Sequence, residues 1–213
     1  VVATGSKITQ EADGLSSGFR RCSNASYIAA LMSRIGVTDI RTIVVPDDIR
    51  QLTRTLVELD AVCDVIITVG GTGKGKRDYT RQAVSDAGGV FVGHDTQLDS
   101  PFVTARLPHA GLIGLPGNPL AVMMIVQCVL LESVRSVFHL PEAPAQTVEA
   151  VMTEDIEAGI CGELCVNVNE SAAKPLIKGT GRMRVFDSAR GFVRLNGQGI
   201  KRGERVRVEL FRN

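Results

Sequence analysis

The chain has 213 residues, a formal net charge of +1 at pH 7, 44% hydrophobic residues and only 4% aromatic residues. This composition describes a soluble globular protein with a sizeable core, and it excludes the basic, aromatic-rich surface on which nucleic acid binds. The longest apolar run, residues 120–131, is shorter than the roughly 20 residues that a membrane span needs. Five cysteines without a disulfide-framework spacing favour a reducing, cytoplasmic location. We therefore expect a small-molecule ligand, and neither a nucleic acid nor a membrane as partner.

Short β-rich runs alternate with amphipathic segments over the first 140 residues. The apolar runs predict strands at 1–3, 40–45, 65–69, 89–93, 102–107 and 111–115. Periodicity and capping residues predict helices from Ser23 as N-cap to Gly36, from Asp47-Asp48 onward, over 79–87 and over 118–139. This alternation predicts an α/β fold of three layers with a mixed, mainly parallel sheet.

The pattern changes at the proline-bearing segment 140–146. Beyond it, glycines separate short strand candidates at 148–157, 163–169, 175–178, 191–195 and 204–211. This pattern predicts a small all-β domain, either a barrel or a sandwich. We therefore expect two domains, 1–140 and 147–213. The sequence opens directly on a strand without an initiator Met, which indicates a piece of a longer chain.

A glycine loop follows the apolar strand 65–69. Its sequence, Gly-Gly-Thr-Gly-Lys-Gly-Lys-Arg-Asp over 70–78, fits neither the Walker pattern nor the dinucleotide fingerprint. Glycines let backbone N–H groups converge on an anion, and Lys74, Lys76 and Arg77 add positive charge. Asp78 then indicates a metal ion beside a phosphate, or acid–base chemistry. The alternative is a solvated glycine turn in which Asp78 caps the next helix.

Four loops that could form a site follow the carboxyl ends of predicted strands, where open α/β sheets bind ligands. They are residues 4–6, 46–48, 70–78 and 114–119. Their shared edge predicts a pocket. Asp47 could instead be the N-cap of the second helix, and Asn118 with Pro119 is a natural helix start.

Several motifs together resemble the molybdopterin molybdenumtransferase family, of the MoeA and gephyrin E-domain type, and its smaller molybdopterin adenylyltransferase relatives. The matching segments are 4–6, 23–24, 46–48, 70–73, 78–80, 114–119, and the C-terminal stretches 179–181, 189–192 and 203–206. They cover nearly the whole chain and correspond to the family's last two domains. The resemblance implies molybdenum-cofactor biosynthesis, with a molybdopterin-binding α/β domain followed by the small β-domain.

The resemblance also implies roles for particular residues. Asp47 and Asp78 would be the catalytic residues and would hold Mg²⁺. The ligand would be molybdopterin or its adenylated form, with molybdate as a second substrate and a homodimer as the assembly. The residues implied to bind molybdopterin are Thr4, Gly5, Ser6, Gly70, Gly71, Thr72, Gly73, Lys76, Pro116, Gly117, Asn118 and Pro119.

Three positions depart from the family's pattern. Lys7 stands where a glutamate is expected, Cys22 stands where an aspartate is expected, and residues 97–101 lack the two lysines of the segment that resembles a molybdate site. These departures leave three functions open. The first is a molybdopterin molybdotransferase, the second is a non-catalytic molybdopterin-binding or scaffolding domain, and the third is a nucleotide pyrophosphohydrolase on the same fold.

Overall fold

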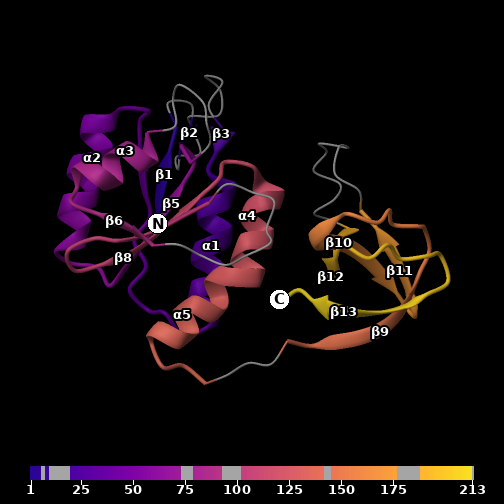
Figure 1. The fold of residues 1–213 in the computed structure, drawn as a ribbon. Helices are drawn as coiled ribbons and strands as arrows, with labels where there is room; N and C mark the ends of the chain where they lie inside the picture. The colour runs from indigo at the N-terminus through magenta and orange to yellow at the C-terminus, as the bar shows by residue number, and fades with distance from the viewer. Residues whose placement is uncertain are drawn as a thin grey trace. The chain divides into compact units, whose positions relative to one another are not determined.

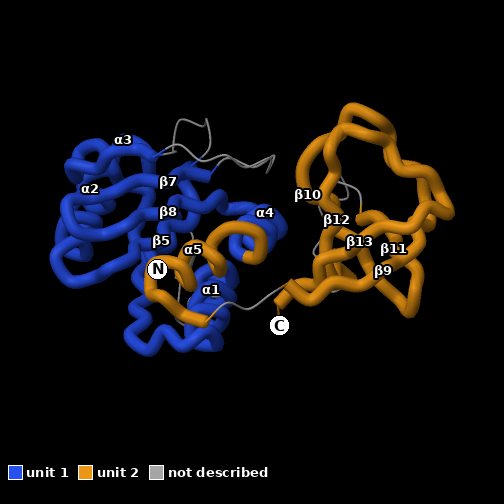
Figure 2. The backbone as a smooth tube through the Cα atoms, turned by 60° about the horizontal axis from the view of Figure 1, so that its bottom comes forward, with its two compact units in different colours: residues 1–95, 100–126 blue, residues 96–99, 127–213 orange. Residues whose placement is uncertain are grey.

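The computed structural model describes residues 1–5, 8–9, 20–72, 79–92, 102–141, 145–176 and 188–212. These residues divide into two compact units, one extending to Val126 and the other starting at Gln127 (Figure 2). The first unit has an α/β architecture and the second is built mainly of strands. Each is described by itself below.

The first unit holds a six-stranded sheet with the order β4-β1-β5-β8-β7-β6. Four strands, β4, β1, β5 and β8, are parallel, and β7 runs antiparallel to both of its neighbours. The predicted mixed, mainly parallel sheet is therefore confirmed. A separate pair is formed by β2 (Ile8–Thr9) and β3 (Arg20–Arg21). The sheet strands are β1 Val2–Thr4, β4 Ile43–Val45, β5 Val65–Val69, β6 Val90–Val92, β7 Val103–Arg106 and β8 Gly111–Leu115.

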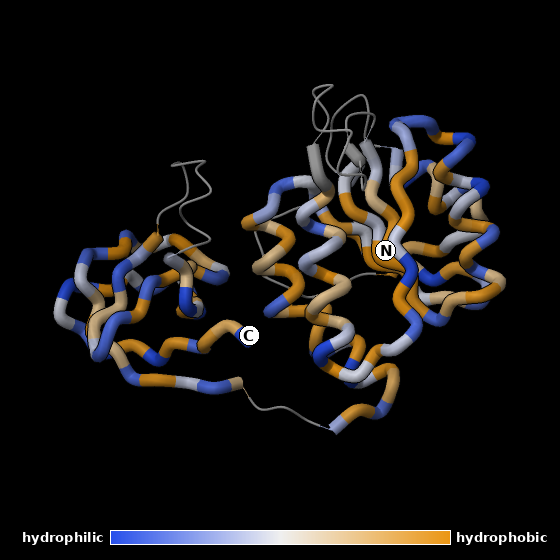
Figure 3. The backbone as a smooth tube through the Cα atoms, turned by 180° about the vertical axis from the view of Figure 1, so that it is seen from behind, coloured by the Kyte–Doolittle hydropathy of each residue, from blue (hydrophilic) through white to orange (hydrophobic). Residues whose placement is uncertain are grey.

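Helices cover both faces of this sheet and complete three layers (Figure 1). On one face, α2 (Ile49–Asp60) and α3 (Thr80–Asp86) pack on a core that includes Val2 and Ile66. On the other face, α1 (Ser23–Arg34) and α4 (Pro119–Ile125) lie against each other, and Ala25 of α1 packs with Ala3. The central strands consist largely of hydrophobic residues (Figure 3), and most of their apolar side chains are buried. The described helices thus hold the sheet from both sides.

The N-cap of α4 is the residue predicted from the sequence, whereas the predicted N-cap positions of α2 and α1 are corrected. Asn118 caps α4, since its Oδ1 accepts from the N–H groups of Leu120 at 2.9 Å and Ala121 at 3.2 Å. The N-cap of α2 is Asp48, whose Oδ1 accepts from Gln51 N at 2.8 Å, so Asp47 is not the cap. At α1 the cap position belongs to Cys22, and Ser23 is already helical.

The predicted helix over 118–139 is present, but it is not uniformly α-helical. After α4 it continues as the π-helical segment η2 (Val126–Leu130) and ends with α5 (Leu131–Val137). By length and composition alone, its 19 residues Pro119–Val137 could cross a membrane, although the apolar run 120–131 within them is shorter than a span. Half of that stretch is buried inside the protein, as in a core helix.

In the second unit, five strands close into a barrel with the order β10-β11-β9-β13-β12. The predicted small all-β domain is confirmed as a barrel, with shifted strand limits. Its interior includes Met152, Val166 and Val208. The strands are β9 Thr147–Met152, β10 Cys161–Asn169, β11 Ala172–Pro175, β12 Gly191–Asn196 and β13 Arg205–Leu210.

One ion-pair network lies across three barrel strands. Arg194 on β12 donates to Glu209 of β13 at 2.8 Å and to Glu163 of β10 at 3.3 Å. The Glu163 side chain is only 6% exposed, and among the described residues its Oε2 has no hydrogen-bond partner. Burial raises the pKa of the Glu163 carboxyl, and the opposing attraction of Arg194 is smaller. Keeping Glu163 ionised therefore destabilises the barrel.

We predict that Glu163→Gln makes the barrel more stable at neutral pH. Because the pKa of Glu163 is raised on folding, its unfavourable contribution is absent below the ordinary carboxyl pKa and grows as pH rises through the folded pKa. Urea unfolding between about pH 4 and pH 8 should show a smaller loss of stability with rising pH in the variant than in the wild type. Glu58→Gln, at an exposed helix pair, should change stability by less than about 0.5 kcal/mol. Identical pH profiles for wild type and Glu163→Gln would contradict this account.

Candidate functional site

The carboxyl ends of β4, β1, β5 and β8 lie side by side at one edge of the sheet. The loops that follow these strands are tied to one another through the backbone. Gly5 N donates to Val45 O at 3.0 Å, and Gly70 N donates to Leu115 O at 2.8 Å. The chain order reverses between β1 and β5, because β1 leads to β4 on one side and β5 lies on the other. Such a switch point is where open α/β sheets bind ligands.

Residues 70–72, the described part of the glycine loop, lie directly on the end of β1. Gly70 and Gly71 adopt φ values of +98° and +65°, which favour glycine. A Cβ on Gly70 would lie 2.7 Å from Thr4 Oγ1 and 3.0 Å from the Thr4 carbonyl oxygen. Thr4 Oγ1 in turn donates to Val69 O at 3.2 Å. The loop can therefore approach β1 this closely only without a side chain at position 70.

Three buried threonines lie in or next to the described part of this loop. Thr68 and Thr80 are 0% exposed and Thr72 is 2% exposed. Thr80 donates its hydroxyl to Gly70 O at 2.9 Å and its N–H to Gly71 O at 3.1 Å. A Cβ on Gly114 would lie 3.1–3.2 Å from side-chain atoms of all three threonines. We call Thr68, Thr72 and Thr80 the threonine cluster. Through the two hydrogen bonds of Thr80, it fixes the position of Gly70 and Gly71.

The loop after β8 also approaches Gly70. Asn24 of α1 donates from Nδ2 to Gly117 O at 3.1 Å. A Cβ on Gly117 would lie 4.0 Å from the Gly70 Cα. These contacts bring Thr4, Gly70 and Gly117 to one small region. Pro116 is buried, while Gly117 and Asn118 are exposed.

Asp47 follows β4 and Cys22 precedes α1, and the two side chains differ in chemistry. Asp47 follows Pro46 after the end of β4 and is half-buried. Burial raises the pKa of the Cys22 thiol, and a hydrogen bond from Ala25 N–H opposes this shift only in part. Cys22 is therefore a neutral thiol at neutral pH, where the family pattern has a carboxylate.

Several predicted site residues cannot be placed. Ser6, Gly73, Lys76 and Asp78 lie outside the described residues, as do Lys7 and residues 97–101. Thr4, Gly5, Gly70, Gly71, Thr72, Pro116, Gly117, Asn118, Pro119 and Asp47 all lie in or beside the loops at the shared edge.

A metal ion bound by protein groups alone does not fit the described part of the site. Within that part no group of three or more His, Cys, Asp or Glu side chains could hold a metal. Mg²⁺ is commonly held by one or two carboxylates together with phosphate oxygens and water. Asp47 fits that mode of binding, in which the ligand completes the coordination.

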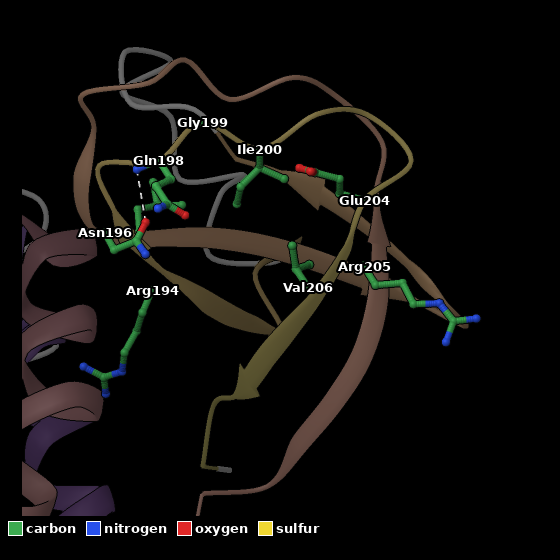
Figure 4. A pocket seen from close by; sticks show the side chains of 9 residues that line it. Arg194, Asn196, Gln198, Gly199, Ile200, Glu204, Arg205 and Val206 are labelled. Carbon is green, nitrogen blue, oxygen red and sulfur yellow. Dashed lines mark hydrogen bonds between the residues drawn. The ribbon is translucent and has the colours of Figure 1, made fainter.

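A depression of about 250 Å³ on the barrel is not a comparable site (Figure 4). Its two arginines, Arg194 and Arg205, point in opposite directions (Figure 4). The local polar groups are used to build turns, as when Asn196 Oδ1 accepts from Gln198 N at 3.1 Å. This surface has no convergent set of ligand-binding groups.

Residues 1–136 match the model of a family described as "Probable molybdopterin binding domain". The chain is 26% identical over 163 residues to a Mycobacterium tuberculosis protein named molybdopterin molybdenumtransferase 2, covering 73% of this chain and 40% of that protein. It is 36% identical over 113 residues to a CinA-like protein of Desulforapulum autotrophicum, covering 53% of this chain and 26% of that protein.

A solved structure shares the whole fold. The molybdopterin biosynthesis MoeA protein of Pyrococcus horikoshii aligns with a TM-score of 0.82 and 22% identity, covering 100% of this chain and 54% of that one. The chain thus spans about half of that protein and less than half of both named relatives.

We predict that Gly70→Ala destabilises the α/β unit more than Gly36→Ala does. Both glycines have nearly the same φ, +98° and +100°, so both alanines carry left-handed strain of about 1–2 kcal/mol. A Cβ on Gly36 meets nothing within 4 Å, whereas one on Gly70 collides with Thr4. Urea unfolding should show a further loss of about 1–3 kcal/mol for Gly70→Ala. Equal losses would mean that the loop does not lie against β1.

Proposed function

Because the chain belongs to the family of probable molybdopterin-binding domains, we propose that it binds molybdopterin or its adenylated form at the sheet edge described above. It would do so as part of a molybdenum-cofactor biosynthesis enzyme of the molybdotransferase type, in the cytoplasm and as a homodimer. The binding domain would comprise residues 1–140, followed by the β-domain 147–213. The observation that carries the proposal is the convergence of Thr4, Gly70 and Gly117 at one switch point.

The ligand's phosphate would be held by the backbone of residues 70–73 and 117–118, with N–H donors from Gly71 onward, because the Gly70 N–H is already donated to Leu115 O at 2.8 Å. Left-handed glycines expose backbone N–H groups that can converge on anionic oxygens. The threonine cluster keeps this backbone in place, since Thr80 bonds both Gly70 and Gly71. Lys76 would add charge, and the residues 4–6 and 116–119 would form the walls of the site. Hydrogen-bond donors that are already held in place bind an anion without the entropy cost of ordering them.

Asp47 and Asp78 would act on the pyrophosphate of the adenylated ligand. Mg²⁺ held by these carboxylates would neutralise the negative charge on the phosphate oxygens. The carboxylates would orient the ion, while the glycine loop holds the phosphate. Molybdate would enter as a substrate.

A second function, a non-catalytic molybdopterin-binding domain, is favoured by one observation at the site. The neutral thiol of Cys22 lies at the start of α1, two residues before the Asn24 that bonds Gly117. A carboxylate at that position would add a metal ligand or a base, which a protonated thiol does not supply. Binding of the ligand through backbone N–H groups would not depend on a carboxylate at position 22.

We predict that the neighbouring changes Asp47→Ala and Asp48→Ala affect different properties. The first affects catalysis and the second affects stability. Asp48 caps α2, so its loss should cost about 0.5–2 kcal/mol of stability and leave chemistry intact. Asp47→Ala should abolish Mg²⁺-dependent AMP release from adenylated molybdopterin and retain molybdopterin binding. The measurements are titration of the chain with both ligands and AMP release with Mg²⁺, with and without molybdate.

Each outcome of that experiment separates the functions. Molybdate-dependent AMP release by the wild type supports the transferase. Binding without release, repeated with the full-length protein, supports the non-catalytic domain. If neither ligand binds, the molybdopterin assignment is wrong.

A further inference from the structure

Thr68 is an unusual residue for its place in the sheet. It is the one polar side chain in β5, whose other residues are valine and isoleucine. β5 lies between β1 and β8, and helices cover both faces of the sheet. Central parallel strands of this kind consist almost entirely of aliphatic residues. Valine has nearly the same shape as threonine and would fit here without introducing a hydroxyl.

The hydroxyl of Thr68 is buried and unsatisfied. Thr68 is 0% exposed, and within the part of the chain that the structure describes its Oγ1 has no hydrogen-bond partner. An unsatisfied buried hydroxyl destabilises the folded state, because its bonds to water are lost without replacement. Such a group in a native protein calls for an explanation, and a role in binding is one.

The Thr68 hydroxyl lies on the side of the sheet where Gly114, Thr72 and Thr80 meet. In the sheet, Thr68 pairs with Gly114 of β8. A Cβ on Gly114 would lie 3.1 Å from Thr68 Oγ1 and 3.2 Å from the methyl carbons of Thr72 and Thr80. Thr68 therefore belongs to the threonine cluster, which holds Gly70 and Gly71 in place. In that cluster the Thr80 hydroxyl already donates to Gly70 O at 2.9 Å.

We propose that Thr68 is a positioning residue of the molybdopterin site, an inference that rests on the function proposed above. An anion bound by the loop draws the N–H groups of this backbone towards itself. The Thr68 hydroxyl then bonds a polar atom of residues 70–72 and holds the backbone in its binding position. Thr68 lies beneath the loop, so it acts through the loop and does not touch the ligand. Its destabilising effect is relieved when the anion binds.

Thr68→Val in the full chain tests this inference, because stability and binding should move in opposite directions. Without ligand, the variant should melt about 2–4 °C higher than the wild type, since an unsatisfied hydroxyl is gone. With ligand, its Kd for molybdopterin should rise about tenfold. Thr68→Ser keeps the hydroxyl and should bind within about twofold of the wild type.

Thr80→Val is the matched control in the same cluster. Its hydroxyl is already bonded to Gly70, so the change should lower both the melting temperature and the affinity. Thr68→Val that binds as tightly as the wild type, or that melts lower without ligand, would overturn the role of Thr68. A wild type that binds no molybdopterin would instead overturn the proposed function, and with it this inference.

Discussion

The architecture of the site depends on the absence of side chains where β5 ends. Gly70 and Gly71 turn the chain in left-handed conformations, and position 70 lies too close to Thr4 for a Cβ. This close approach brings the glycine loop over β1 and next to the loop at Gly117. The four parallel strands supply the common edge, but the two glycines allow the loops to converge there.

The fold was largely predictable because hydrophobic period and turn residues report it locally. The strand 65–69 and the cap at Asn118 agree with the structure residue for residue. The choice between Asp47 and Asp48 as cap was not predictable, since both are acidic and adjacent. The π-helical turn at Val126–Leu130 was not predicted, because a local shift of hydrogen-bond register does not show in the mostly apolar pattern of this helix.

The common edge of the loops followed from strand direction alone, but the contacts within the site did not. The bond from Asn24 to Gly117 joins residues 93 positions apart. The threonine cluster depends on the register that sets Thr68 beside Gly114 and on the docking of α3. Such contacts are fixed by tertiary packing, so a threonine in an apolar strand carries no sequence signal of its role. Burial and an unsatisfied hydroxyl reveal it.

Under the proposed function, binding and chemistry would use different groups at this edge and could therefore be lost separately. The described loops present backbone groups and neutral hydroxyls, which can hold an anion without titrating near neutral pH. Bond cleavage needs charged groups, and under the proposed function these would be Asp47 and Asp78. A neutral thiol at Cys22 removes a charge from the second set and leaves the first unchanged. The close contacts at Gly70 do not involve Cys22, so the proposed binding of an anion would not depend on which residue occupies position 22.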